Sequence, residues 1–315
     1  MLKIYKNSGE KLQGLSLLGL EKGAWLDLVG PTEEEIEAVA AATNVPQDFL
    51  RAALDAEERS RIDIEENCLL VLTNIPVQYS RDSYDTLPLG ILVTPDYILT
   101  VCLSTTPVMA DFAPETPRTF NSFKRTRFLF QILYRSATLY LKYVTQINRL
   151  TDEIEKDLRR SMRNEEIFEM LQLEKSLTFF SASLKANAVV LERLLRLCAS
   201  NQLPHLVKRY EEDEDLLEDV IVENRQAIEM VEMYSHILSG MMSTFASIIS
   251  NNINQVMKFL ASATIILAVP TMVSGLLGMN VPIPLQNPES FWHVVAIAGF
   301  LAGLVAVSLW RKGFF

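Results

Sequence analysis

A line of mostly small or polar residues near the end of the chain has the spacing of one face of a helix. Its members recur at alternating steps of three and four residues. They are Asn254, Met257, Ala261, Thr264, Ala268, Thr271, Gly275 and Gly278. Amide and hydroxyl groups without carboxylates suit weak, multi-site passage of a hydrated cation rather than tight chelation. Small residues also allow close helix packing, so a dry helix interface explains the same pattern.

Most of this line lies in an apolar segment at residues 259–277, and a second apolar segment follows at residues 291–310. Neither segment contains Asp, Glu, Lys or Arg. A helix that rises about 1.5 Å per residue needs about 20 apolar residues to cross about 30 Å of hydrocarbon. Two buried core helices are the alternative, which is disfavoured because soluble helices of this length seldom lack a charged face. The sequence therefore predicts an integral membrane protein.

The basic residues near these segments predict their orientation. The connecting loop, 281–290, has no Lys or Arg, whereas Lys258 precedes the first segment and Arg311 and Lys312 follow the second. Positive residues collect on the cytoplasmic side of membranes. Residues 1–7 also lack the long apolar core of a signal peptide. We therefore expect a multi-pass protein of the plasma (inner) membrane with both termini in the cytoplasm.

The charge of the chain narrows the classes of partner that it can bind. The 315 residues are 22% charged and carry a formal net charge of -10. This balance argues against nucleic acid as a partner and leaves carboxylates available for cations. No GxGxxG, P-loop or HExxH motif is present, so an enzyme is not expected. The three cysteines form no CxxC pair and are predicted to be reduced and buried; they are Cys68, Cys102 and Cys198.

Hydrophobic periodicity predicts an α+β fold for the cytoplasmic part, with a mixed sheet and flanking helices. Strands are expected at residues 2–5, 24–28, 68–77, 87–93 and 98–103. Thr32 and Glu35 form a capping box at the start of a helix through Ala42, and a short helix should begin near Pro46. The predicted organisation is an α/β domain (1–121), a helical hairpin (122–212), a stalk helix (213–256), a first span (257–280), an outer loop (281–290), a second span (291–310) and a tail (311–315).

The stalk and the first span form one long helical pattern, because only Gly240 and Pro270 interrupt it between Leu216 and Leu277. A helix of about 60 residues would reach about 90 Å and needs neighbours to support it. Two spans cannot enclose a channel by themselves. If the line of small and polar residues lines a pore, several copies must surround an axis.

The residues at both ends of the first span resemble those of the CorA family of magnesium channels. They are Asn254-Gln255-Val256-Met257-Lys258, Pro270, Gly275 and Gly278-Met279-Asn280. The resemblance implies a homopentameric funnel in which the first span lines the pore and Gly278, Met279 and Asn280 form the selectivity filter. Magnesium dehydrates reluctantly, so a ring of Asn280 amides suits recognition of the hydrated ion.

The resemblance also implies roles for residues further inside. Asn254, Met257 and Leu260 would form the constricted inner segment, with Thr264 and Ala268 further along the pore and Thr271 and Gly275 nearer the mouth. Asp48 and Asp219 would bind a regulatory Mg2+ between subunits and close the channel when intracellular magnesium is high. Taken without the family, Asp48 is an ordinary acid at a helix start and Asp219 is one of many. Gln47 and Leu277 depart from the family pattern.

Two other functions fit the same sequence. One is a related transporter of Zn2+ or another divalent cation, which Met279 disfavours because the zinc-transporting branch commonly varies this position. The other is a membrane-anchored scaffold without transport. The expected partners are further copies of the chain, membrane lipid and divalent cations.

Overall fold

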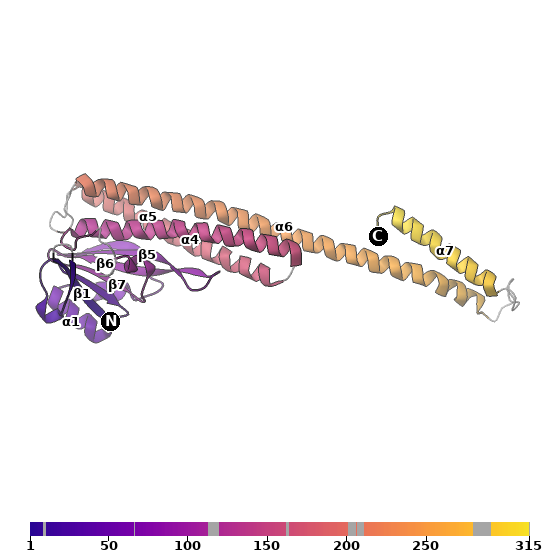
Figure 1. The fold of residues 1–315 in the computed structure, drawn as a ribbon, viewed down its shortest axis with the longest axis horizontal. Helices are drawn as coiled ribbons and strands as arrows, with labels where there is room; N and C mark the ends of the chain where they lie inside the picture. Colours follow the sequence, from indigo (N-terminus) through magenta and orange to yellow (C-terminus); the bar gives the residue numbers. More distant parts are fainter. Residues whose placement is uncertain are drawn as a thin grey trace. The chain divides into compact units, whose positions relative to one another are not determined.

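The computed structural model describes residues 1–8, 11–65, 67–112, 120–161, 164–200, 206, 211–279 and 291–314. The chain forms two compact units, Met1–Ser239 and Gly240–Phe315. Figure 1 shows a sheet and helices in the first unit and two helices in the second. The long helix α6, Glu211–Leu277, contributes to both units and confirms the prediction that the stalk and the first span form one helix.

The first unit contains one seven-stranded mixed sheet of order β2-β1-β3-β7-β6-β5-β4. Its only parallel neighbours among the described strands are β3 and β7. The strands are β1 Leu2–Ser8, β2 Lys11–Leu15, β3 Trp25–Val29, β4 Arg61–Glu65, β5 Cys68–Gln78, β6 Tyr84–Val93 and β7 Ile98–Cys102. The sequence did not predict β2 and β4. Both are edge strands with many polar residues, so neither contains the apolar run that marked the other five.

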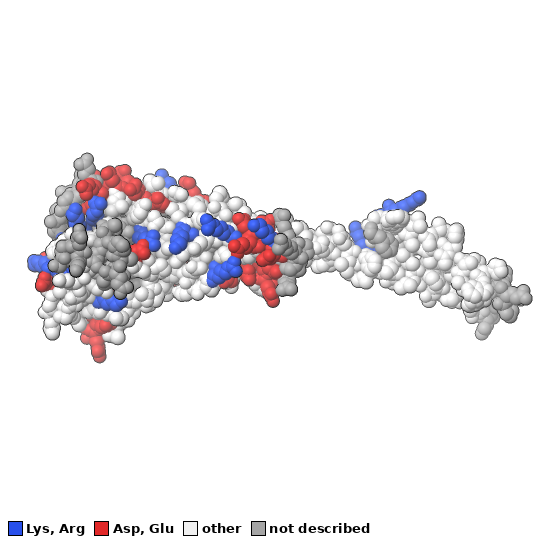
Figure 2. Space-filling model, in the orientation of Figure 1, with Lys and Arg blue, Asp and Glu red and all other residues white. Residues whose placement is uncertain are grey.

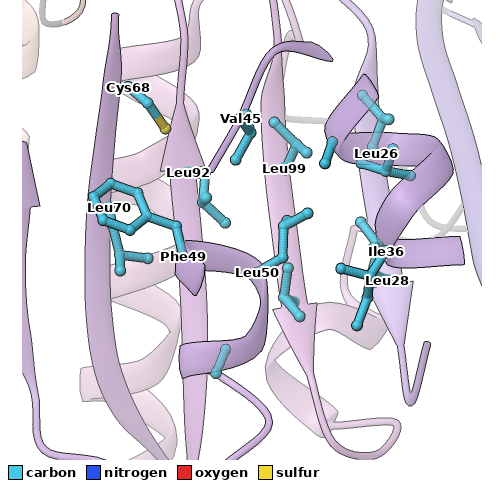
Figure 3. Close-up of a cluster of buried hydrophobic side chains, with 14 of the residues drawn as sticks. Leu26, Leu28, Ile36, Val45, Phe49, Leu50, Cys68, Leu70, Leu92 and Leu99 are labelled. Carbon is cyan, nitrogen blue, oxygen red and sulfur yellow. The ribbon is translucent and has the colours of Figure 1, made fainter. Parts of the chain in front are cut away.

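Two short helices cover one face of the sheet: α1, Glu33–Thr43, and α2, Gln47–Ala52. The predicted capping box is confirmed, because Glu35 N donates to Thr32 Oγ1 at 3.3 Å and Thr32 N donates to Glu35 Oε2 at 3.1 Å. Asn44 then ends α1 in the left-handed conformation. Figure 3 shows the apolar side chains that these helices and the sheet bury together, including Leu26, Leu28, Ile36, Val45, Phe49, Leu50, Leu70, Leu92 and Leu99.

Two long helices cover the other face of the sheet: α4, Arg125–Ser161, and α5, Asn164–Ser200. Shorter pieces are the 3-10 turn Leu17–Gly19 and α3, Pro107–Ala110. Cys68, Cys102 and Cys198 are buried and free, as predicted. Burial raises the pKa of the Cys68 thiol to about 12, so the thiol stays protonated at neutral pH.

The first part of α6 packs on α4 and α5 along a seam with heptad spacing. The buried residues of this seam on α6 are Asp213, Leu217, Val220, Asn224, Ala227, Val231 and Leu238. Asn224 Nδ2 donates to the Leu184 carbonyl at 3.2 Å, and Lys185 Nζ lies 2.7 Å from Glu232 Oε1. Within the first unit, α4 and α5 therefore lie between the sheet and α6.

Candidate functional site

The predicted line of small and polar residues lies on α6 and is exposed along its whole described length. Every member from Asn254 to Gly278 is exposed, as are Leu260 and Met279. In the second unit, α7, Phe291–Arg311, runs back beside the end of α6 (Figure 1).

The face of α6 that is shielded is a different one. Its buried or partly buried residues include Ser262, Ile266, Val269 and Val273. Successive residues of an α-helix are about 100° apart, so this face lies on the opposite side of α6 from Thr264 and Thr271. Among the described residues, none buries the polar line, so another copy of the chain could cover it.

The two threonines of the line have the same hydroxyl arrangement. Thr264 Oγ1 donates to the Leu260 carbonyl at 2.8 Å, and Thr271 Oγ1 donates to the Leu267 carbonyl at 3.1 Å. A hydroxyl has one proton and two acceptor lone pairs. Because its proton is used by the backbone, each oxygen presents hydrogen-bond acceptors, which are what the water ligands of a cation require.

The C-terminal end of α6 is shaped by glycine and proline. Pro270 lies inside the helix and has no N–H to donate to the preceding turn. Gly278 N donates to the Ser274 carbonyl at 2.9 Å just after the helix ends. A Cβ on Gly278 would lie 3.1 Å from that carbonyl oxygen, whereas one on Gly275 would meet nothing within 4 Å. Asn280 and the loop 281–290 lie outside the described residues.

Both helices of the second unit are long and apolar enough to cross a membrane. The described residues of this unit carry three Lys or Arg side chains, Lys258, Arg311 and Lys312, and no Asp or Glu. Figure 2 shows the uncharged surface along this unit, with its Lys and Arg side chains at one end of the apolar region. A long uncharged surface with basic residues at one end is typical of a helical hairpin in a membrane.

Asp48, one of the two predicted regulatory residues, lies in the first turn of α2 and its side chain is 97% exposed. Its carboxylate has a basic neighbour, since Arg51 Nη1 lies 3.8 Å from Asp48 Oδ1. The same guanidinium binds Glu33 on α1, with Nη2 at 2.8 Å and Nε at 3.2 Å from Glu33 Oε2. The i,i+3 spacing of Asp48 and Arg51 was visible in the sequence, but the anchor at Glu33 was not.

Asp219, the other predicted regulatory residue, is exposed on α6. The sheet and the layer of α4 and α5 lie between α6 and α2, so one chain does not bring Asp219 and Asp48 together. Among the residues that the structure describes, no group of three or more His, Cys, Asp or Glu side chains could hold a metal ion. These two carboxylates can share an ion only if they come from two copies of the chain.

The acidic start of α6 has a structural role at Asp213, which the sequence did not single out from its neighbours. Asp213 is 4% exposed, and Arg127 Nη1 on α4 lies 3.2 Å from both Asp213 Oδ1 and Glu212 Oε2. Burial raises the pKa of Asp213, and the nearby charge of Arg127 opposes that rise. This ion pair fixes the first turn of α6 against α4.

Comparison with known proteins extends over both units. A family model described as CorA-like Mg2+ transporter protein matches residues 21–311. The cobalt/magnesium transport protein CorA of Methanocaldococcus jannaschii is 28% identical over 279 residues, which are 87% of this chain and 85% of that protein. The protein of the same name from Thermotoga maritima is 26% identical over 178 residues, 54% of this chain and 48% of that protein.

A solved structure gives a similar result. The complete structure of the CorA magnesium transporter from Methanocaldococcus jannaschii matches with a TM-score of 0.83 and 25% sequence identity. The match covers 100% of this chain and 99% of that one. The likeness therefore includes the sheet, the long helices and both candidate spans.

Proposed function

The chain belongs to the family of CorA-like Mg2+ transporter proteins, and on that basis we propose that it forms a membrane channel for divalent cations that mainly admits Mg2+. The observation that carries this proposal is the exposed polar face of α6, which α7 leaves uncovered and which presents hydroxyl acceptors at Thr264 and Thr271. This face lies in a helix that is long and apolar enough to span a membrane.

The proposed channel is a homopentamer. One chain has two candidate spans, which cannot enclose a pathway, and its polar face is exposed. Five copies, the number that the family resemblance implies, would turn these faces toward a common axis and cover them. The N- and C-termini would lie in the cytoplasm, with Arg311 and Lys312 on the inner side of the plasma membrane.

The outer mouth is proposed to select the ion by its hydration shell. Gly278, Met279 and Asn280 would form the filter, with Asn280 amides accepting from and donating to the waters around Mg2+. Because Mg2+ keeps several waters in most protein sites, recognition of the hydrated ion avoids the cost of dehydration. The acceptors at Thr271 and Thr264 would then contact the same waters further in, with Ala268 and Gly275 leaving room beside them.

The inner segment is proposed to hold the gate. Asn254, Met257 and Leu260 would form the constriction, and the apolar side chains of Met257 and Leu260 would close it by excluding water. Intracellular Mg2+ bound between Asp48 of one copy and Asp219 of the next would offset the repulsion of the two carboxylates. Such binding favours the closed pentamer and supplies feedback on uptake.

Ion flux through purified protein in liposomes tests this function. We expect Mg2+ entry that a magnesium-sensitive dye inside the vesicles reports, and slower entry of Zn2+ at equal concentration and membrane potential. Faster entry of Zn2+ would assign the protein to zinc transport instead. No entry of Mg2+, Co2+ or Zn2+ into vesicles that contain assembled protein would leave a membrane-anchored scaffold as the function.

A further inference from the structure

Arg51 carries a positive charge beside Asp48. Its Nη2 and Nε both bind Glu33 Oε2, which fixes the plane of the guanidinium on the surface of α1 and α2. The remaining nitrogen, Nη1, lies 3.8 Å from Asp48 Oδ1. All three side chains are on the surface, so none of them needs this arrangement to satisfy a buried group. The arrangement therefore places a permanent charge next to a carboxylate that is open to ions.

We propose that Arg51 is a resident cation of the regulatory site, which competes with Mg2+ for Asp48 and raises the magnesium concentration needed to close the channel. This inference rests on the proposed function, in which Asp48 of one copy and Asp219 of another hold the regulatory ion. It adds a determinant of the closing threshold that lies on the same helix as Asp48.

Electrostatics gives the direction and size of the effect. A Mg2+ ion at Asp48 must approach the positive guanidinium, and Arg51 already neutralises part of the carboxylate's charge. For two unit charges about 4 Å apart in water, the interaction corresponds to about a fivefold change in a binding constant. The value for water applies because the Asp48 side chain is 97% exposed. Glu33 keeps Arg51 in place, so the competing charge persists when the ion leaves.

The test uses the full-length protein in proteoliposomes of one orientation, with Mg2+ influx measured against the Mg2+ concentration on the cytoplasmic side. For Arg51→Gln we expect the half-inhibitory concentration to fall about fivefold. Arg59→Gln removes the same charge from an exposed position after α2 and should leave the curve unchanged. A second readout, thermal stabilisation of the purified assembly by Mg2+, should shift to lower concentration in Arg51→Gln by the same factor.

The outcomes separate this inference from the function on which it rests. If Asp48→Asn with Asp219→Asn abolishes inhibition but Arg51→Gln keeps the wild-type curve and thermal shift, Arg51 is not a competitor and the inference is overturned alone. If the double variant keeps the wild-type inhibition curve, the regulatory site is elsewhere and both proposals are overturned. Equal shifts in Arg51→Gln and Arg59→Gln would show a general effect of net charge, which also contradicts the inference.

Discussion

The side-chain amide of Asn187 on α5 binds both backbone polar atoms of Asn74 in β5. Asn187 Oδ1 accepts from Asn74 N at 3.0 Å, and Asn187 Nδ2 donates to Asn74 O at 2.7 Å. Strand β4 begins at Arg61, which pairs with Leu72, so no residue of β4 pairs with Asn74. The Asn187 amide binds the Asn74 N–H and carbonyl in place of such a strand residue. It thereby joins the helical layer to the sheet.

Replacing Asn187 with Ala should lower the stability of the first unit by about 1–3 kcal/mol, because it leaves the partly buried Asn74 N–H without a partner, whereas the Asn74 carbonyl keeps its bond from Tyr140 Oη at 2.9 Å. The change removes two bonds to Asn74 and one from Ser60 Oγ at 2.8 Å. Thermal denaturation followed by circular dichroism measures the effect. Val189→Ala, at a residue that is 62% exposed on the same helix, is the control. Equal unfolding temperatures for the two variants would show that the Asn187 amide does not hold the layers together.

Asp27 in β3 should make stability depend on pH. Its Oδ1 accepts from Thr100 Oγ1 at 2.8 Å, and Thr100 Oγ1 accepts from Trp25 Nε1 at 2.9 Å. Burial raises the pKa of Asp27 above its ordinary value of 3.8, although the Thr100 bond, Lys3 and the N-terminal amine oppose the rise. The folded state therefore holds this proton more tightly than the unfolded state.

The sign follows from proton linkage. The protonated Asp27 carboxyl stabilises the folded state at low pH, and this contribution is lost as the pH rises through the raised pKa of Asp27 in the folded state. Asp27→Asn can still accept from Thr100 but has no proton to lose, so the wild type should gain stability relative to the variant as pH falls toward 3.8. Unfolding temperatures of both proteins between pH 7 and pH 4 provide the measurement. A constant difference across this range would mean that the Asp27 carboxyl titrates alike in the folded and unfolded chain.

Assembly should bury the polar face of α6. Native mass spectrometry of the protein in detergent is expected to show five copies, because two spans per chain cannot enclose a pathway. Thr264→Leu, which places a bulky apolar side chain on that face, should weaken or distort the assembly more than Phe300→Leu. Phe300 is 68% exposed on α7 and does not belong to the polar face. A stable monomer or dimer as the main wild-type species would contradict the pentamer.

Asn280→Ala should abolish Mg2+ uptake without preventing assembly, because it removes the amides proposed to bind the hydrated ion at the mouth. Asn287→Ala, in the loop 281–290 that follows, should retain uptake. The dye assay in liposomes compares the two variants after size-exclusion chromatography has confirmed equal assembly. Wild-type uptake by the Asn280 variant would remove this residue from the filter.

The sequence predicted most of the fold because its signals are local. Apolar runs marked five strands, the Thr32–Glu35 spacing marked a helix start, and the lack of charge marked both spans. The edge strands β2 and β4 were missed because their residues are largely polar. Contacts between distant segments, such as Asn187 with Asn74 and Arg51 with Glu33, have no periodic signature, so only the folded chain reveals them.

The candidate site was likewise predictable from the sequence only in part. Regular spacing placed the polar line on one face of α6, and the buried or partly buried residues of this part of α6 lie on a different face. Arg127 and Asp213 are 86 residues apart, and their ion pair depends on how α4 meets α6. The filter at Asn280 stays a prediction, since this residue lies outside the part of the chain that the structure describes.

Cysteine accessibility tests most directly whether the polar face of α6 lines the ion pathway. In a background without Cys68, Cys102 and Cys198, Thr264→Cys and Phe300→Cys would each be treated with a positively charged methanethiosulfonate reagent during Mg2+ influx at low cytoplasmic magnesium. The reagent dissolves in water and not in lipid, so it reaches a thiol at Thr264 only through a hydrated pore. We predict that it blocks influx through Thr264→Cys and leaves Phe300→Cys unaffected. Unchanged influx through an active Thr264→Cys protein, or block of Phe300→Cys alone, would contradict the account.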